Sequence, residues 1–597
     1  MNTKDGTKDK PADFRATSLR ILRGFNADPL RLTAVLVLAL LAMGMTVVNP
    51  LLLGRATDTV VDGVRGSGVE FTAVAWILGF AAAMAAAAWI FQVILGRLIA
   101  VMAQRMAYKL RQDTDTKLSR LPLSYFDTQP RGEVLSRTTN DIDNLSQTVQ
   151  QVFARVLVSL LLLLGTVIMM FVLSPLLAVV ALATVPVIVW TTKTIGKRAQ
   201  PRFKRQWAAT GELNGHIEEM YSGHELVTAF GRRDEAAEVF TRHNEEVYSS
   251  SIKAQFISGL ISPAMGFLGN INYVLVAVIG GIRVASNAMS IGEIQAFIQY
   301  VQQFNQPLTA FAALSGQIQS AVASAERVFE LLDAEEQEAD TAAPQEFGEL
   351  RGAVEFAGVG FRYKKDEPLI DDLNLSVAPG RTVAIVGPTG AGKTTLVNLL
   401  LRFYELDSGH IMVDGVDTTS VPRARLRSNI GMVLQDTWLF GGTIADNIAY
   451  GNPEATREQV IDAAKAVYAD RLIRTLPEGY DTVIDADGDG LSAGERQLIT
   501  IARAFLIEPS ILVLDEATSS VDTRTEMLVQ HAMAKLRVGR TSFVIAHRLS
   551  TIRDADVILV MEAGRIVETG SHTELLAANG AYARLHKAQF AAAPVAG

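Results

Sequence analysis

The sequence predicts a multidomain membrane protein, in which an all-α transmembrane domain of six helices with long cytoplasmic helical hairpins precedes an α/β nucleotide-binding domain. Two observations carry this prediction. The long uncharged stretches of the 597-residue chain lie before about residue 325, and a glycine-rich loop of the phosphate-binding type follows at residues 387–394. A chain of this length is also too long for one ordinary hydrophobic core, so at least two domains are expected.

Five charge-free stretches predict the transmembrane helices. Each exceeds the roughly 18 to 20 apolar residues that a helix needs to cross a bilayer, whereas a soluble helix normally shows a polar face. The third stretch is long enough for two spans, which Ser174 and Pro175 divide, so six spans are expected. The stretches cover residues 33–54, 71–96, 156–192, 254–282 and 294–325.

Basic residues predict the orientation of these spans. Arginine and lysine gather before the first span, after the second and after the fourth, whereas the connections at residues 62–70, 174–175 and 283–290 are short and poor in them. By the positive-inside rule the N-terminus, both long loops and the C-terminal half are cytoplasmic, as in a multi-pass protein of the cytoplasmic membrane. The charged leader is too long for a cleavable signal peptide.

The amino-acid composition excludes several kinds of site and argues against one class of partner. The chain has no cysteine, which excludes disulfides, thiolate metal sites and a cysteine nucleophile. A formal net charge of −8 is modest for this length and argues against a nucleic-acid partner. The lipid bilayer is the partner that the spans require.

The segments around the spans are expected to be helical. Residues 14–31 form a candidate amphipathic helix on the membrane surface, although an ordinary leader would look similar. Each long cytoplasmic loop contains a candidate short transverse element, at residues 122–127 and 211–222. The predicted domains are an N-terminal segment with an elbow helix (1–31), the transmembrane domain (32–330), a linker (331–349), the nucleotide-binding domain (350–589) and a tail (590–597).

The sixth span carries an unusual number of amides. Gln295, Gln299, Gln302 and Gln306 recur at intervals of three and four residues, which places them on one face of a helix. Amides in hydrocarbon are costly unless they face other helices or a water-filled cavity. We expect this face to line a cavity, with hydrogen bonding between helices as the alternative.

The loop at residues 387–394 has the glycine and lysine spacing that cradles a phosphate, between a predicted buried strand (382–386) and a predicted helix (395–401). Glycines let backbone N–H groups and the helix N-terminus face the β-phosphate. Lys393 is expected to reach the β and γ oxygens, and the Thr394 hydroxyl to ligate Mg²⁺. The predicted nucleotide-binding residues here are Gly387, Pro388, Thr389, Gly390, Ala391, Gly392, Lys393, Thr394 and Thr395.

Two further apolar strands end in groups suited to phosphate chemistry. The strand at residues 511–514 ends in Asp515 and Glu516, which we expect to hold Mg²⁺ and to polarise the attacking water, respectively. An acidic strand end without a catalytic role is the alternative. The strand at residues 541–546 ends in His547, and a lone histidine in this position is usually structural.

Together these ordered motifs resemble the ATP-binding cassette family. Residues 491–497, Leu-Ser-Ala-Gly-Glu-Arg-Gln, are similar to that family's signature sequence, and six spans followed by one cassette resemble a half-transporter of the multidrug-exporter type. The resemblance implies that Tyr363 stacks on adenine, that Gln435 senses Mg²⁺ and couples to the membrane domain, and that His547 contacts the γ-phosphate. It also implies that Asp522 ends the loop that crosses between two cassettes. The predicted catalytic residues are Glu516, His547, Lys393 and Gln435, and the predicted Mg²⁺ ligands are Thr394, Gln435 and Asp515.

The resemblance further implies a dimer, because each ATP is expected to lie between the P-loop of one cassette and the signature of another. Ser492 and Gly494 would then offer a hydroxyl and a backbone N–H to the nucleotide of a second half-transporter subunit. The signature departs from the family's usual Leu-Ser-Gly-Gly-Gln, because Ala493 adds a methyl group and Glu495 adds a negative charge near an anion. An altered signature beside intact catalytic groups favours a heterodimer over a homodimer.

The leading functional prediction is ATP-driven export of a small hydrophobic or amphipathic compound, drug-like or lipid-like. Amides in the sixth span and the lack of charge at mid-membrane favour such a substrate over a small ion. The alternatives are a siderophore-type importer of the same fold and an ATP-gated channel or regulator. No binding or reducing domain for a siderophore is visible in the sequence, and Glu516 favours turnover over simple gating.

Overall fold

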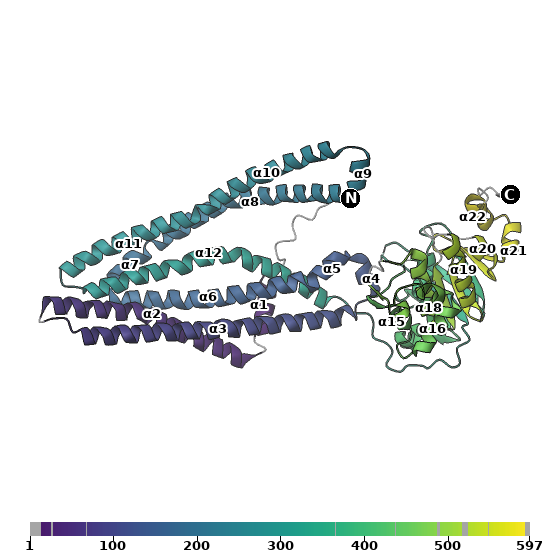
Figure 1. The fold of residues 1–597 in the computed structure, drawn as a ribbon, viewed down its shortest axis with the longest axis horizontal. Coiled ribbons are helices and arrows are strands. Elements are labelled where there is room, and N and C mark those ends of the chain that lie inside the picture. The colour runs from purple at the N-terminus through teal and green to yellow at the C-terminus, as the bar shows by residue number, and fades with distance from the viewer. Residues whose placement is uncertain are drawn as a thin grey trace. The chain divides into compact units, whose positions relative to one another are not determined.

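The structure, a computed structural model, describes residues 14–25, 28–66, 68–364, 366–435, 437–485, 490–515, 523–546 and 549–590 (Figure 1). Its contacts divide the chain into two units. The helical unit comprises Met1–Ser119 and Arg131–Ala334, and the C-terminal unit comprises Arg120–Pro130 and Glu335–Gly597. The short helix α4 (Leu123–Thr128) therefore belongs to the C-terminal unit, although in the sequence it falls between two helices of the helical unit.

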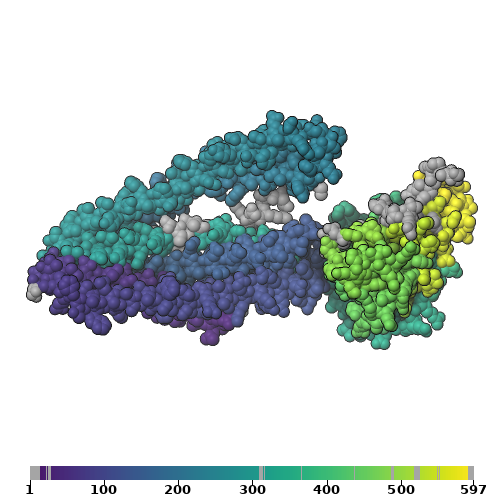
Figure 2. All heavy atoms as spheres, viewed as in Figure 1, coloured from purple at the N-terminus to yellow at the C-terminus, as the bar shows by residue number. Residues whose placement is uncertain are grey.

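Among the described residues of the helical unit, five helical stretches are long and apolar enough to cross a membrane. The sixth long helix, α12, carries the glutamines noted above, which lower its mean hydropathy. Helix α12 packs along α6, α2 along α3, and α8 along α10, and Figures 1 and 2 show α8 and α10 diverging from α6 and α12 toward α9. The helices of this unit are α1 (Phe14–Phe25), α2 (Pro29–Arg65), α3 (Phe71–Leu118), α5 (Arg131–Thr138), α6 (Asn140–Leu173), α7 (Pro175–Leu182), α8 (Val185–Ser222), α9 (His224–Ala229), α10 (Arg233–Gly259), α11 (Ile261–Ala285) and α12 (Ile291–Asp333).

The helix breaks follow local chemistry. The predicted division at Ser174 and Pro175 is confirmed: Ser174 ends α6, and its hydroxyl caps α7 by accepting a hydrogen bond from the Leu177 N–H. The transverse element predicted at residues 211–222 is wrong, because these residues continue α8. Packing along α10 overrides the low helix propensity of its glycines, and the break comes at Gly223, after which α9 is the short helix.

Helices α2 and α12 meet backbone to backbone at Gly54 and Gly292. A Cβ atom at Gly292 would lie 1.9 Å from the Gly54 carbonyl oxygen, so both positions require glycine for this approach. One turn further along α2, Asp58 accepts hydrogen bonds of 2.7 Å from the Ser290 hydroxyl and from the Gly292 N–H. Because Ser290 is the N-cap of α12, the carboxylate also faces the positive end of that helix.

The glutamine face of α12 is divided between two environments. Gln295 accepts a hydrogen bond of 2.5 Å from the Thr57 hydroxyl of α2, so this amide joins two helices, which was the alternative left open by the sequence. Gln299 is half-buried, whereas Gln302 and Gln306 are exposed on the helical unit. The face therefore begins as an interhelical contact and continues as an accessible polar surface.

The C-terminal unit is built on a six-stranded sheet of order β12-β11-β3-β10-β9-β6, accompanied by a four-stranded sheet of order β2-β1-β4-β5 and the pair β7-β8. In the larger sheet β11, β3, β10, β9 and β6 are parallel, and β12 is antiparallel to β11. The strands are β1 (Val354–Phe361), β2 (Ile370–Val377), β3 (Thr382–Val386), β4 (Ser408–Val413), β5 (Val416–Asp417), β6 (Ile430–Val433), β7 (Gly442–Thr443), β8 (Val483–Ile484), β9 (Ile511–Asp515), β10 (Thr541–Ile545), β11 (Val557–Glu562) and β12 (Arg565–Gly570).

Two hydrophobic cores cover the two faces of the larger sheet. Along β3, Ala384 and Val386 contribute to one core, whereas Val383 and Ile385 contribute to the other. Both faces are buried, which explains why the central strands read as continuous apolar runs. The helices of this unit, besides α4, are α13 (Lys393–Leu400), α14 (Arg423–Arg427), α15 (Ile444–Ala449), α16 (Arg457–Ala466), α17 (Ala469–Ile473), α18 (Ala493–Leu506), α19 (Thr523–Arg537), α20 (Leu549–Arg553), α21 (His572–Ala577) and α22 (Ala581–Phe590).

Candidate functional site

The parallel strands β3, β10, β9 and β6 end in register at one edge of the sheet. Ile385 of β3 is paired with Ile545 of β10, which is paired in turn with Asp515 of β9. On the far side of β9, Leu514 is paired with Val433 of β6. The segments that leave these strands therefore start from one row, as ligand-binding segments of parallel sheets commonly do.

Three of the predicted groups share this edge. The loop at residues 387–394 follows β3, Asp515 is the last residue of β9, and Gln435 lies two residues beyond β6. Residues this far apart in the chain come together because the strands are parallel and in register. The edge thus brings together a glycine loop, a carboxylate and an amide.

Glycine is required in the loop for two different reasons. Gly390 and Gly392 have positive φ angles of 83° and 95°, in a region that residues with a Cβ atom rarely adopt. At Gly387 the reason is space, because a Cβ atom there would lie 2.2 Å from the carbonyl oxygen of Met561. Gly392 is the N-cap of α13, so the loop ends at the positive end of a helix.

Lys393 places its ammonium group over the loop. Its Nζ donates hydrogen bonds of 2.9 Å to the carbonyl oxygens of Gly387 and Pro388. Burial lowers the pKa of Lys393, and the nearby carboxylate of Asp515 opposes this shift. A cation beside a glycine loop and a helix N-terminus provides an anion site, which fits the phosphates of a nucleotide.

The groups predicted to hold Mg²⁺ have suitable chemistry. Thr394 is exposed at the start of α13, Gln435 is exposed beyond β6, and Asp515 lies half-buried at the end of β9. Hydroxyl, amide and carboxylate oxygens are hard ligands of the kind that Mg²⁺ prefers, together with water and phosphate. The residues present therefore fit the ion.

Tyr363 lies against the helix that follows the loop. Its hydroxyl is 3.2 Å from Oγ1 of the buried Thr395, and its ring meets Phe361 and Tyr404 edge-on, at 4.8 and 5.1 Å between centroids. Half of the Tyr363 side chain remains exposed. An aromatic ring fixed by two others and open on one side is suited to stacking on a base.

The signature segment forms the start of α18. Ser492 is the N-cap, and its hydroxyl accepts a hydrogen bond of 3.4 Å from the Glu495 N–H. In return, the Glu495 carboxylate accepts one of 2.7 Å from the Ser492 N–H, which completes a capping box. Glu495 therefore stabilises its own helix, a role that the interpretation as a repulsive charge missed, although the Ser-x-x-Glu spacing signals it in the sequence.

Three predicted residues, Glu516, Asp522 and His547, lie outside the described residues. Their roles stay predictions from their places in the chain. In the sequence, Glu516 directly follows Asp515, and His547 comes two residues after the end of β10.

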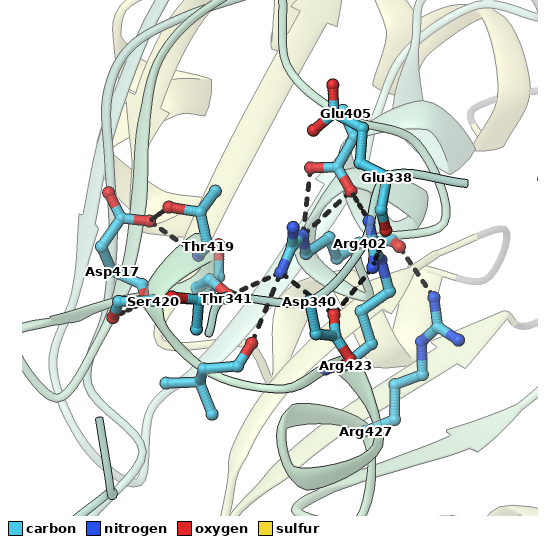
Figure 3. A network of polar contacts seen from close by, with 12 residues as sticks. Glu338, Asp340, Thr341, Arg402, Glu405, Asp417, Thr419, Ser420, Arg423 and Arg427 are labelled. Carbon is cyan, nitrogen blue, oxygen red and sulfur yellow. Dashed lines mark hydrogen bonds and ion pairs between the residues drawn. The ribbon is translucent and has the colours of Figure 1, made fainter. Parts of the chain in front are cut away.

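Sequence reasoning missed an ion cluster around the linker in the C-terminal unit (Figure 3). Asp340 of the linker accepts hydrogen bonds from the Arg423 backbone N–H at 3.2 Å and from Arg423 Nη1 at 2.7 Å. Glu405 accepts bonds of 3.0 Å from Nε of the buried Arg402 and also bonds to Arg423. Beside this cluster, the Tyr404 hydroxyl donates to Asp127 of α4. Apart from the i,i+3 pair of Arg402 and Glu405, the partners are distant in the chain, 83 positions for Asp340 and Arg423 and 277 for Asp127 and Tyr404, so no local pattern predicts them.

Comparisons with known proteins agree with this geometry. Residues 32–308 match the profile described as ABC transporter transmembrane region, and residues 370–519 match that described as ABC transporter. The chain is 48% identical to the fatty acid ABC transporter ATP-binding/permease protein of Mycobacterium tuberculosis, over 96% of this chain and 97% of that one. It is 38% identical to the ATP-dependent lipid A-core flippase of Syntrophus aciditrophicus, over 84% and 82% of the two chains. A solved bacterial Atm1-family ABC exporter with ATP bound matches with a TM-score of 0.76 at 29% identity, over 96% and 99% of the chains.

Proposed function

Since the chain belongs to the ABC transporter family, as an exporter half-transporter of the cytoplasmic membrane that couples ATP hydrolysis to transport, we propose that it exports fatty acids or similar lipid-like amphipaths. The observation that carries the substrate class is the 48% identity to a protein named as a fatty acid transporter, which extends over nearly the whole of both chains. The polar but uncharged Gln302 and Gln306 on α12 also suit an amphipath better than an ion. The domain boundaries given above stay predictions.

The ATP site assigns a role to each residue at the sheet edge. Backbone N–H groups of residues 387–394 bind phosphate oxygens, and Lys393 donates to them as a cation. Thr394, Gln435 and Asp515 would hold Mg²⁺, which neutralises phosphate charge when bound. Glu516 orients and polarises the attacking water.

We expect Glu516→Gln to abolish transport. The amide cannot accept the proton of the attacking water, so ATP hydrolysis falls by about 100-fold or more while ATP still binds. The measurement is ATP-driven accumulation of a radiolabelled fatty acid in inside-out vesicles, with hydrolysis followed in parallel.

Glu454→Gln, at an exposed glutamate of the same unit, is the matched control and leaves both rates unchanged. Transport that survives in Glu516→Gln would refute the catalytic role. Hydrolysis by the unaltered chain that never accumulates fatty acid, yet accumulates a cationic drug, would refute the substrate class instead.

The second proposal concerns the subunit composition of the dimer. We propose a heterodimer in which this chain supplies the intact P-loop and receives an unaltered signature from its partner. Because Glu495 caps its own helix, the departure from the usual signature that supports a heterodimer is chiefly the methyl group of Ala493, the first residue of α18. A homodimer is the alternative.

We expect the chain purified alone to hydrolyse ATP slowly. The double substitution Ala493→Gly and Glu495→Gln restores the usual signature and should raise this rate by about tenfold or more. The reason is that hydrogen-bond donors of the signature stabilise the negative charge that develops on the phosphate in the transition state. Steady-state ATP hydrolysis by the unaltered chain and by the double variant, each purified and in lipid, distinguishes the heterodimer from the homodimer. A fully active, transporting dimer of the unaltered chain would disprove the heterodimer.

A further inference from the structure

The helical unit contains a pocket of about 480 Å³ at the inner ends of its first spans, where α1 packs beside α3 and α12. Its walls come from α1, from the start of α2, from α3, from Leu145 of α6 and from the end of α12. Arg31, on this wall, directly precedes the first charge-free stretch of the chain. The pocket therefore lies where the positive-inside rule places the inner surface of the membrane.

The floor of the pocket is apolar. Met102 of α3 is buried, and Ile21, Met106 and Phe329 pack against the buried core of the helical unit. These side chains come from three helices, so the floor is a surface that tertiary packing creates. An apolar floor suits hydrocarbon, and the methionines on it adapt readily to flexible chains.

The rim of the pocket is cationic. Five basic side chains line it against two acidic ones, Asp28 and Asp113. Asp28 is shared, because Arg31 lies 3.1 Å and Arg105 3.7 Å from the same carboxylate oxygen. The basic side chains are Arg20, Arg23, Arg31, Arg105 and Lys109.

Part of this positive charge is unmatched. Within the described part of the chain, no carboxylate lies at ion-pair distance from Arg23 or Lys109, both of which are exposed. Arg31 is instead paired, because its buried Nη1 lies 3.1 Å from the Asp28 carboxylate, although outside hydrogen-bond geometry. An anion at the rim would pair with the two unmatched cations.

We propose that this pocket binds an anionic phospholipid of the inner leaflet, with its phosphate on the basic rim and an acyl chain along the apolar floor. A phosphate suits the rim better than a carboxylate, because it offers more acceptor oxygens to several cations and pairs well with guanidinium groups. Basic pockets between transmembrane helices on the cytoplasmic side bind such head groups. The proposal does not depend on which substrate is transported.

The pocket also connects to α12. Arg20 of α1 lies 4.1 Å above the Phe329 ring and donates hydrogen bonds of 2.5 and 2.9 Å to Asp333, the last residue of α12. A lipid in the pocket would thus bridge α1, α3 and the end of α12. Its binding should hold these three helices together.

The test compares two double variants of the full-length protein in nanodiscs of phosphatidylcholine, with and without phosphatidylglycerol. Native mass spectrometry counts retained phosphatidylglycerol, and thermal shift measures the stabilisation. We expect Arg23→Ala with Lys109→Ala to weaken phosphatidylglycerol binding by about tenfold or more. Arg198→Ala with Lys204→Ala removes the same charge from exposed positions on α8 and should leave binding unchanged.

Two outcomes would contradict the proposal. Equal losses in the two double variants would overturn the proposal, because the attraction would then be a property of the whole cytoplasmic surface. Oleate that displaces phosphatidylglycerol at equal mole fraction would overturn the assignment to a phospholipid. Unchanged ATP hydrolysis in pure phosphatidylcholine verifies that the pocket variant is folded, and the substitution Met106→Glu, which charges the floor, should also abolish binding.

Discussion

Lys393→Ala is expected to abolish ATP hydrolysis and with it transport. The substitution removes the ammonium group of Lys393, which lies over the glycine loop, while the backbone cradle of residues 387–394 and the cap at Gly392 remain. Loss of one preorganised hydrogen-bond donor to the negative charge that develops in the transition state lowers the rate by about 100- to 1,000-fold. Steady-state phosphate release from the protein in lipid measures it.

Lys465→Ala is the matched control, since this lysine pairs with Asp462 on the exposed side of α16 and touches no part of the loop. It should hydrolyse ATP at the unaltered rate. If Lys393→Ala kept more than a tenth of the hydrolysis rate, the ammonium group would not be the phosphate donor proposed here, and the backbone N–H groups would carry the site alone.

Glu405→Ala is expected to cause a large loss of stability in the C-terminal unit. Its carboxylate accepts two bonds from Arg402 and one from Arg423, whose side chains are 6% and 9% exposed (Figure 3). Removal leaves two nearly buried guanidinium groups sharing Asp340, which lies 3.8 Å from one and 2.7 Å from the other. Breaking a buried pair costs about 3 to 5 kcal/mol, and the partial exposure of Glu405 points to the lower end.

The measurement is the apparent melting temperature of the full-length protein, followed by hydrogen exchange in the C-terminal unit. A loss of about 3 kcal/mol corresponds to a fall of roughly 6 to 12 °C for a domain of this size. Glu367→Ala is the control, because its pair with Lys364 is exposed on both sides and contributes little. Equal melting temperatures for the two variants would show that the cluster is not a source of stability.

Local patterns predicted the parts of the site that depend on neighbours in the chain. The apolar run that ends in Asp515, the glycine spacing at residues 387–394 and the helix break at Ser174 each follow from a few consecutive residues, and the structure places them as expected. The register of the parallel strands then brings the loop and Asp515 to one edge, which is the arrangement that the order of motifs implied.

What the sequence did not reveal depends on distant partners. Arg402 lies three residues before Glu405, but nothing near either residue indicates that Arg423 completes the cluster, and nothing near Asp127 indicates that it accepts from Tyr404. The short transverse element expected at residues 211–222 of the second cytoplasmic loop does not form, because these residues continue α8 in its packing along α10. Glu495 is different, because its capping signal was present in the sequence and was interpreted as repulsion.

The contact of Gly54 with Gly292 has a mechanical consequence. Hydrogen bonds fasten α2 to α12 on both sides of this close backbone approach: the Tyr300 hydroxyl donates to the Val47 carbonyl oxygen, Thr57 donates to Gln295, and Asp58 accepts from Ser290 and Gly292. The two helices are therefore joined over about three turns. We expect them to move as one rigid body when the transmembrane helices change their packing.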